Sequence, residues 1–361
     1  MKSLWNDIEA QEFKSDLDLR VYTSRLLGKN SNLVLHGGGN TSVKTIVKNL
    51  FDEEEEILYV KGSGWDLETI ESAGFAPVKM DILLKMAGLD ALSDSDMVKY
   101  QRAAMLDPTA PNPSVEAILH AIIPFKFVDH THADTVVTIS NTPDGEKRLR
   151  EIYGEKVLII PYVMPGFDLA KLVYEATKGI NWDELEGIIL SNHGVFTFDN
   201  DARVSYEKMI NFITKSEKYL LKNGAMVCGD DIEGDLSFFA SIGVFFNSFF
   251  TKSGKCFLGS TNNANEESHM DLLELSKLRK KISVEKNHAV IVKMNNSEKA
   301  IHYSNMPTVE KIATRGPLTP DHVIRTKRVP LIVGGNIDEN LHDYIKEYNE
   351  YFDENKTEGL T

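Results

Sequence analysis

The pattern of hydrophobic and polar positions predicts a chain that mixes strands and helices over its first 225 residues. Apolar residues that alternate with polar ones, or that form short continuous runs, indicate strands, and apolar residues at helical spacing indicate helices. The predicted strands are residues 32–36, 41–48, 56–61, 127–141, 157–163, 187–191 and 195–198. The predicted helices are residues 12–27, a helix that begins at Ser114, and residues 201–222. The sequence therefore predicts an α/β fold.

A polar stretch at residues 223–234, with three glycines and three acidic residues, is the predicted boundary between two domains. The first domain is expected to span residues 1–225, and a smaller C-terminal α/β region is expected to span residues 235–361. The elements expected in that region are an aromatic-rich apolar segment at 236–250, a loop at 261–268, helices at 272–281 and 341–352, and strands at 289–293 and 331–333.

Composition and charge narrow the function. The chain has 361 residues, of which 42% are hydrophobic, and its 54 acidic residues outnumber its 40 lysines and arginines. This balance excludes the basic surface that nucleic-acid binding requires. The longest apolar segment, 236–250, is too short to span a membrane, and the N-terminus does not resemble a signal peptide, so a cytoplasmic protein is expected. Two cysteines, Cys228 and Cys256, lack Cys-x-x-Cys spacing and cannot build a cysteine zinc site.

Three histidines and one glutamate are the candidate metal site. His130 and His132 are two residues apart on a predicted strand, so their side chains share a face with Cα atoms about 6.5 to 7 Å apart. His193 lies in a turn between two predicted strands, and Glu116 lies in the predicted first turn of a helix. Imidazoles commonly bind divalent transition metals. The alternative for each residue is an ordinary polar strand face, turn residue or helix carboxylate.

Two glycine-rich loops, residues 37–42 and 62–64, are candidate phosphate sites. Glycines leave backbone N–H groups accessible, and the neighbouring hydroxyl and amide side chains add donors. The alternative is two hairpin turns. Neither loop is a Walker A motif, because Gly-Lys-Ser/Thr is absent, and the first loop leads into β-branched residues rather than into the helix of a dinucleotide-binding motif.

Five motifs in this order resemble the class II aldolase/adducin family. They are Gly-Gly-Gly-Asn-Thr-Ser at 37–42, Lys-Gly-Ser-Gly-Trp at 61–65, Pro-Ser-Val-Glu at 113–116, Asp-His-Thr-His-Ala-Asp at 129–134 and Ser-Asn-His-Gly at 191–194. The chain is most similar to the rhamnulose-1-phosphate aldolase-like branch, which includes the aldolase part of bifunctional aldolase/short-chain dehydrogenase proteins. The resemblance implies a three-layer domain in which helices flank a central, mainly antiparallel sheet.

The resemblance also implies a ligand set. A divalent metal, expected to be Zn²⁺, would be held by His130, His132 and His193, with Glu116 as the acid/base residue and a further ligand of the resting metal. The positions that match the substrate-phosphate site of the family are Gly39, Asn40, Ser63, Gly64 and Ser114. Two departures, Val115 in place of a second serine and Gly37 in place of a threonine, put the identity of the phosphate group in question.

The function that the resemblance implies is a lyase that cleaves a ketose 1-phosphate, such as rhamnulose or fuculose 1-phosphate. The products would be dihydroxyacetone phosphate and an aldehyde, formed through a metal-stabilised enediolate, in a homo-oligomer expected to be a tetramer. The alternatives are a sugar-phosphate 4-epimerase or dehydratase at the same metal site, a metal-dependent hydrolase, and a non-catalytic adducin-like scaffold. The presence of all three histidines argues against the scaffold.

A basic segment at residues 315–328 stands out in this acidic chain. It contains Arg315, His322 and Arg325, together with Lys327 and Arg328. One interpretation is that the segment folds over the active site and supplies positive charge for the phosphate or for a sugar carboxylate. The other is a surface loop whose arginines pair with local acids. Both interpretations remain open from the sequence.

Overall fold

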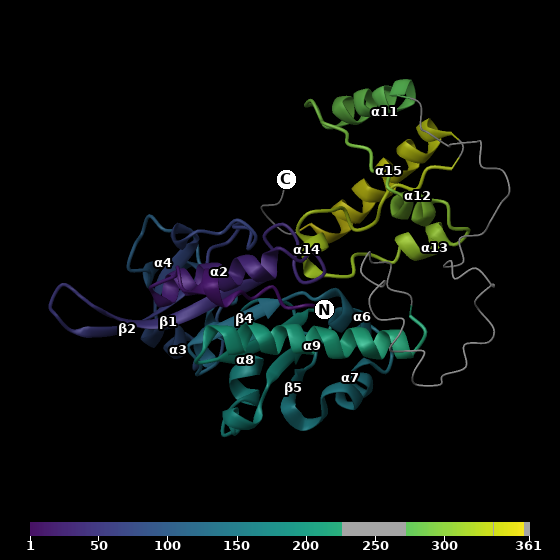
Figure 1. The fold of residues 1–361 in the computed structure, drawn as a ribbon. Coiled ribbons are helices and arrows are strands. Elements are labelled where there is room, and N and C mark those ends of the chain that lie inside the picture. Colours follow the sequence, from purple (N-terminus) through teal and green to yellow (C-terminus); the bar gives the residue numbers. More distant parts are fainter. Residues whose placement is uncertain (226–271, 335, 357–361) are drawn as a thin grey trace. The chain divides into compact units, whose positions relative to one another are not determined.

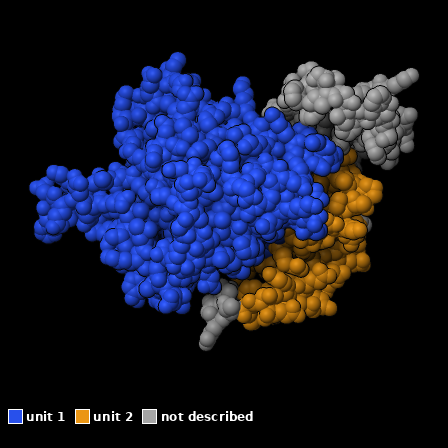
Figure 2. All heavy atoms as spheres, turned by 90° about the horizontal axis from the view of Figure 1, so that it is seen from below, with its two compact units in different colours: residues 1–226, 317–327 blue, residues 227–316, 328–361 orange. Residues whose placement is uncertain are grey.

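A computed structural model describes residues 1–225, 272–334 and 336–356. The chain divides into two compact units: unit 1 is Met1–Met226 with Pro317–Lys327, and unit 2 is Val227–Gly316 with Arg328–Thr361 (Figure 2). The division into domains at 1–225 and 235–361 stays a prediction, and unit 1 takes in the additional segment Pro317–Lys327. The predictions for residues 236–250, 261–268 and the two cysteines lie outside the described residues.

Unit 1 is built on a seven-stranded sheet with the order β3-β2-β1-β4-β7-β6-β5. The strands are β1 (Asn40–Lys48), β2 (Glu54–Lys61), β3 (Phe75–Lys79), β4 (Phe127–Thr131), β5 (Val157–Ile160), β6 (Gly187–Leu190) and β7 (Gly194–Asp199). All neighbours pair antiparallel except β5 and β6, which pair parallel. The expected central, mainly antiparallel sheet is therefore confirmed.

Helices cover both faces of this sheet and complete three layers (Figure 1). One face packs against α2 (Asp16–Gly28), α6 (Asp134–Ser140), α7 (Gly145–Tyr153) and α9 (Ala202–Lys222), and the other against α3 (Met80–Ala87), α4 (Asp94–Ala103), α5 (Ala117–Ile122) and α8 (Phe167–Ala176). The strands serve both cores by alternation. In β6, for example, Ile188 and Leu190 belong to one core and Ile189 to the other.

The two longest helices of unit 1 begin where their capping residues place them. Ser15 and Asp18 form a reciprocal capping box at the start of α2, and the Asp201 side chain accepts a hydrogen bond from the Val204 N–H at the start of α9. The helix predicted at 201–222 is thereby confirmed, and the helix predicted at 12–27 is confirmed from Asp16 onward, since residues 12–15 are not helical. The remaining short elements of unit 1 are α1 (Asp7–Ala10), α14 (Pro320–Val323), and the 3₁₀ turns Ser72–Gly74, Gly154–Lys156 and Trp182–Glu184.

The strand predicted at residues 127–141 is wrong in its second half. The strand β4 ends at Thr131, and the β-branched residues that follow form helix α6. Val136 and Ile139 lie three residues apart and pack into the same core, and Thr135 Oγ1 lies 2.7 Å from Ser216 Oγ of α9. Packing against α9 thus overrides the strand preference of these residues.

Three other predicted strands are also wrong. Residues 32–36 form turns in which the Leu33 N–H donates to the Asn30 carbonyl (2.9 Å), so buried Leu33 and Val34 fill the core from a loop. Residues 289–293 and 331–333 are not strands, and Ile291 is 97% exposed, so its apolar side chain meets no partner. The predicted strand at 157–163 ends at Ile160, and the helix expected from Ser114 begins at Ala117.

Unit 2 contains, in its described residues, four helices and the loops between them. They are α11 (Leu272–Glu285), α12 (Glu298–Ser304), α13 (Val309–Ala313) and α15 (Ile337–Asn355). The helices predicted at 272–281 and 341–352 are confirmed. Within this unit the Tyr344 hydroxyl donates to the Val329 carbonyl (2.7 Å), and Leu341 is buried. Across all described residues, no helix has the length and apolar character needed to cross a bilayer.

A candidate metal centre

Three histidines meet at one end of the neighbouring strands β4 and β7. His130 is in β4, His132 follows directly after its end, and His193 precedes β7. All three are buried, and a ligand atom from each lies within 4.8 Å of the others. Their ring centroids are 4.8 to 5.1 Å apart. The structure thus brings together the three imidazoles that the sequence singled out, at a spacing that could hold one divalent ion.

Hydrogen bonds fix which ring nitrogens face the shared space. His130 Nδ1 lies 3.2 Å from the Val195 carbonyl oxygen, and His132 Nδ1 lies 2.5 Å from Asp321 Oδ1. Both oxygens accept hydrogen bonds, so each Nδ1 donates, and the Nε2 of each ring is the nitrogen left for the shared space. The two Nε2 atoms are buried without a hydrogen-bond partner, which buried polar atoms rarely are. A metal ion fits these two atoms.

Burial also favours the protonation state that metal binding needs. It lowers the pKa of His130 well below its ordinary value, and it lowers the pKa of His193 from 6.5 to about 4. The charged form of each ring would have to leave water for an apolar interior. Both rings are therefore neutral at pH 7, as ligands must be.

Glu116 lies beside the histidines, at the residue that precedes helix α5. Its Oε2 is 3.4 Å from His130 Nε2, and its Oε1 is 3.3 Å from His193 Nε2. The carboxylate is buried, and Oε1 has no hydrogen-bond partner. The Glu116 N–H donates to Ser114 Oγ (3.3 Å), which holds the turn that aims the side chain. Glu116 can therefore either add a ligand or exchange a proton with a molecule bound at the cluster.

A buried chain of hydrogen bonds holds this carboxylate in place. The Asn40 amide nitrogen donates to Glu116 Oε2 (2.6 Å) and to Ser114 Oγ (3.1 Å). The amide oxygen of Asn40 must then accept from His120 Nε2, which leaves His120 Nδ1 to accept from Ser42 Oγ (2.8 Å). Burial lowers the pKa of His120 well below its ordinary value, consistent with this neutral form. His120 therefore supports the site through Asn40.

The other residues singled out for phosphate binding differ in their surroundings. Ser63 and Gly64 are exposed, and a side chain at Gly64 would meet no neighbouring atom within 4 Å. Gly39 is buried with a φ of 57°, and a Cβ there would lie 2.5 Å from Val34 Cγ1, so backbone conformation and close packing both require this glycine. The Lys61 side chain also lies at the first glycine loop, where its Nζ donates to the Gly37 carbonyl (2.8 Å).

The basic segment contributes Asp321, a carboxylate that was not predicted as a site residue from the sequence. Asp321 is 2% exposed and contacts His132 within unit 1. Arg325 is exposed and donates through Nε to the His36 carbonyl (2.9 Å), and His322 Nδ1 lies 2.8 Å from Thr319 Oγ1. Arg315 is exposed and belongs to unit 2. No local signal could have revealed Asp321, because 189 residues separate it from its partner.

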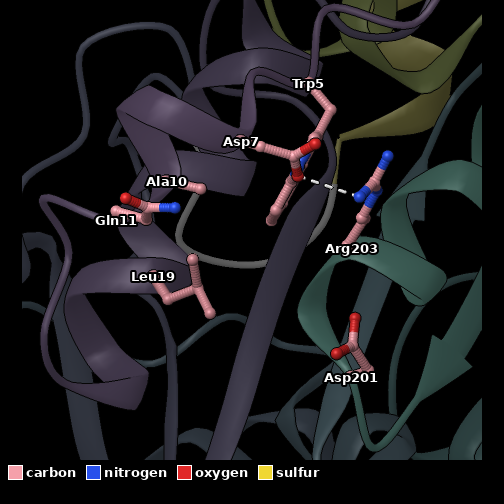
Figure 3. A pocket seen from close by; sticks show the side chains of 7 residues that line it. All are labelled: Trp5, Asp7, Ala10, Gln11, Leu19, Asp201 and Arg203. Atoms are coloured by element: carbon pink, nitrogen blue, oxygen red, sulfur yellow. Dashed lines mark hydrogen bonds and ion pairs between the residues drawn. The ribbon is translucent and has the colours of Figure 1, made fainter.

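One surface cavity lies elsewhere on unit 1. It has a volume of about 350 Å³ and is lined by Trp5, Asp7, Ala10, Gln11, Leu19, Asp201 and Arg203 (Figure 3). Its arginine is paired with Asp7 (2.8 Å) and lies over the Trp5 ring. Neither Glu116 nor any of the three clustered histidines lines it. The histidine cluster is therefore the stronger candidate for chemistry.

Comparison with known proteins identifies the family of this chain. The sequence model of the class II aldolase and adducin N-terminal domain matches residues 19–220, more than half of the chain. The chain belongs to the class II aldolase and adducin family. A second model, for the second domain of class II aldolases, matches residues 270–361. The resemblance seen in the five sequence motifs is confirmed.

The chain is also similar to individual known proteins. It is 29% identical to the "Uncharacterized oxidoreductase YuxG" of Bacillus subtilis, over 99% of this chain and 50% of the relative, so it spans about half the length of that curated protein. It is 41% identical to the N-terminal class II aldolase domain of a conserved protein from Thermoplasma acidophilum, with a TM-score of 0.56 over 61% of this chain and 99% of that domain. L-fuculose-1-phosphate aldolase from Thermus thermophilus is 16% identical, with a TM-score of 0.37 over 57% and 98% of the two chains.

Proposed function

We propose that this protein is a metal-dependent aldolase that cleaves a ketose 1-phosphate, of the rhamnulose or fuculose 1-phosphate type, to dihydroxyacetone phosphate and an aldehyde. The observation that carries the proposal is the buried cluster of His130, His132 and His193, with Glu116 at 3.3 to 3.4 Å from two of the rings. Membership of the class II aldolase and adducin family supports the lyase class.

The donor set suits Zn²⁺. Three imidazoles with room for one more ligand are a common arrangement in catalytic zinc sites. We assign His130, His132 and His193 as the ligands, with Glu116 able to take the further position. A bound divalent ion supplies Lewis acidity toward the carbonyl oxygen of the substrate.

The proposed cleavage needs a balanced transfer of two protons. The C4 hydroxyl gives its proton to solvent, the C3–C4 bond breaks, the aldehyde leaves, and the electron pair stays on C3. A second proton is then added at C3, which completes dihydroxyacetone phosphate. We assign this second transfer to Glu116, which gives its carboxyl proton to C3 and is reprotonated from solvent, because its Oε1 has no hydrogen-bond partner while Oε2 is held by Asn40.

We assign the substrate phosphate to the two glycine loops. Ser63 and Gly64 are exposed, and no atom would obstruct a side chain at Gly64. The Ser63 N–H donates to the Asn112 carbonyl (2.8 Å), so the Ser63 hydroxyl and the Gly64 N–H are the groups that we assign to the anion. We also assign Gly39, Asn40 and Ser114 to this site. Asn40 and Ser114 are hydrogen-bonded to Glu116, Gly39 directly precedes Asn40, and Lys61 adds a positive charge at the first loop. The tetrameric assembly and the cytoplasmic location stay predictions.

The test combines metal analysis with a substrate panel. Purified protein is analysed for metal content and then assayed with a set of ketose 1-phosphates, with dihydroxyacetone phosphate release followed by a coupled reductase. Glu116→Gln should keep the metal and lose about 10²- to 10⁴-fold in turnover, the usual contribution of a positioned acid or base. His132→Ala should lose the metal.

Each outcome has a distinct meaning. Release of dihydroxyacetone phosphate from one sugar supports the aldolase. Conversion of a sugar phosphate without this product, in a metal-containing protein, would instead point to the 4-epimerase or dehydratase. Wild-type protein that binds no divalent metal would overturn the metal-dependent function altogether.

A further inference from the structure

Residues 317–327, which we call the return segment, belong to unit 1 although they are far from it in sequence. The chain leaves unit 1 after Met226 and contributes to it again only through Pro317–Lys327. Two residues of the return segment, Thr319 and Asp321, are 3% and 2% exposed. The segment is therefore seated in unit 1 rather than lying loosely on its surface.

The Asp321 carboxylate is buried, and it packs against Gly38 of the first glycine loop. Asp321 Oδ2 accepts a hydrogen bond from the Leu35 N–H (2.7 Å), and Oδ1 accepts from His132 Nδ1 (2.5 Å). A Cβ at Gly38 would overlap the carboxylate, so a larger residue there would exclude it. Both oxygens of Asp321 thus have one fixed donor each.

We propose that Asp321 is a positioning residue of the metal centre, supplied by the return segment. A carboxylate accepts hydrogen bonds and donates none, so it holds the proton of His132 on Nδ1 and leaves the Nε2 lone pair facing the cluster. A carboxylate partner also fixes the ring orientation and makes the imidazole a stronger donor to a metal. This inference rests on the metal site of the proposed function.

His130 and His132 differ in the group that accepts the hydrogen bond from Nδ1. Its Nδ1 donates to a backbone carbonyl, that of Val195, at 3.2 Å. A neutral carbonyl in a strand is present whether or not residues 317–327 are seated, whereas His132 depends on them for its acceptor. The three-histidine cluster is therefore completed by a residue outside the continuous stretch 1–226.

The test measures metal affinity in full-length variants. Metal-free wild type, Asp321→Asn, Asp321→Ala and Thr319→Val are titrated with Zn²⁺ against a chromophoric chelator. Asp321→Asn and Asp321→Ala should weaken binding about 10- to 100-fold, the usual effect of removing the partner of a metal-binding histidine. Thr319→Val is the matched control: it removes a partly buried hydrogen bond of the same segment, to His322, and leaves Asp321 intact, so its affinity should equal that of wild type.

A second measurement tests whether Asp321 fixes the proton of the His132 ring or only stabilises the surrounding fold. In ¹⁵N-histidine-labelled, metal-free protein, long-range NMR correlations report which ring nitrogen carries the proton. His132 should carry it on Nδ1 in wild type and in Thr319→Val, and should lose this preference in the Asp321 variants. Asp321→Asn guards against a failure of Asp321→Ala to fold, because it keeps the size of the side chain.

The outcomes distinguish this inference from the proposed function. Wild-type protein without metal affinity overturns the function. Tight binding by wild type, together with unchanged affinity and an unchanged His132 tautomer in folded Asp321→Asn, overturns the role of Asp321. Equal weakening by Thr319→Val and Asp321→Asn would also overturn it, because seating of the segment rather than the carboxylate would then control the metal.

Discussion

The side-chain amide of Asn40 donates a hydrogen bond of 2.6 Å to Oε2 of Glu116. The same amide is fixed from behind, because its oxygen accepts from His120 Nε2 and Ser42 Oγ lies 2.8 Å from the other nitrogen of that ring. Asn40 was expected among the phosphate contacts, yet its hydrogen bond places it first as a support for the carboxylate. The position of Glu116 over the histidines therefore depends on residues of β1.

Asn40→Ala should lower turnover with little loss of metal. The carboxylate loses the donor that aims it, and a misplacement of about 1 Å in a catalytic group can cost about 100-fold in rate. We expect a fall of this order in kcat for the active ketose 1-phosphate, with a smaller rise in KM and bound metal retained. Steady-state kinetics and metal analysis check this result.

Separate measurement of kcat and KM also tests whether Asn40 binds the substrate phosphate. A raised KM with unchanged kcat would show that the amide acts on the substrate phosphate rather than on Glu116. Ser42→Ala is a useful comparison, because it removes the far end of the hydrogen-bond chain and keeps the Asn40 amide. It should reduce kcat less than Asn40→Ala does.

Gly194→Ala should disturb both the fold and the metal site. A Cβ at Gly194 would overlap the Thr131 carbonyl oxygen and would lie 2.8 Å from His130 Cε1. Overpacking of this kind costs about 1 to 3 kcal/mol of stability, and relief requires His130 to move. We expect a lower urea midpoint and weaker Zn²⁺ binding than in wild type.

Gly88→Ala provides the matched control for that substitution. Gly88 ends helix α3 with helical backbone angles, and the nearest atom to an added Cβ is Lys85 O at 3.4 Å. This variant should keep metal affinity and nearly all stability. Equal metal affinity in Gly194→Ala and Gly88→Ala would show that the histidines tolerate a side chain at position 194.

The histidine cluster could be predicted from the sequence because local geometry decides most of it. Alternation along β4 sends His130 to one side and Asp129 to the other, where it pairs with Arg20. The turn before β7 was equally visible, since the Asn-His-Gly sequence separates two apolar strands. Such features depend on neighbours within a few residues, so periodicity and turn residues reveal them.

The rest of the site depends on contacts between distant residues. Neither Asp321 beside His132 nor His120 beside Asn40 follows from spacing, because the pairs are 189 and 80 residues apart. The same limit explains α6, whose β-branched residues predicted a strand but form a helix against α9. Where packing and local preference conflict, the sequence pattern alone cannot show which prevails.

Arg20→Met should strongly destabilise unit 1. Arg20 Nη2 lies 2.5 Å from Asp129 Oδ1, and both side chains are fully buried. Removing one member of a buried ion pair leaves an uncompensated charge and costs about 3 to 5 kcal/mol. Urea unfolding of metal-free protein measures the loss. The double variant Arg20→Met/Asp129→Leu should recover part of the lost stability, because no buried charge remains. A double variant whose loss equals the sum of the losses in the two single variants would contradict this explanation.

Lys44 should make the stability of the metal-free protein depend on pH above neutrality. Its Nζ donates to the carbonyls of His120 (2.9 Å) and Phe125 (2.7 Å), and burial lowers its pKa from 10.5 to about 7. The unfolded chain keeps the ordinary pKa, so between these values it binds more protons than the folded protein does. The free energy of unfolding must therefore rise with pH in this range and fall as the pH returns to 7.

Comparison of wild type with Lys44→Met isolates this contribution. A single lysine adds a slope of at most about 1.4 kcal/mol per pH unit, and Lys44→Met should remove it. Lys61, whose pKa burial lowers to about 8, adds a slope of the same sign that both proteins share. Urea unfolding at pH 7, 8 and 9 gives the two slopes. Equal slopes in the two proteins would mean that Lys44 stays protonated in the folded state, with its ammonium group held by the two carbonyls despite its burial.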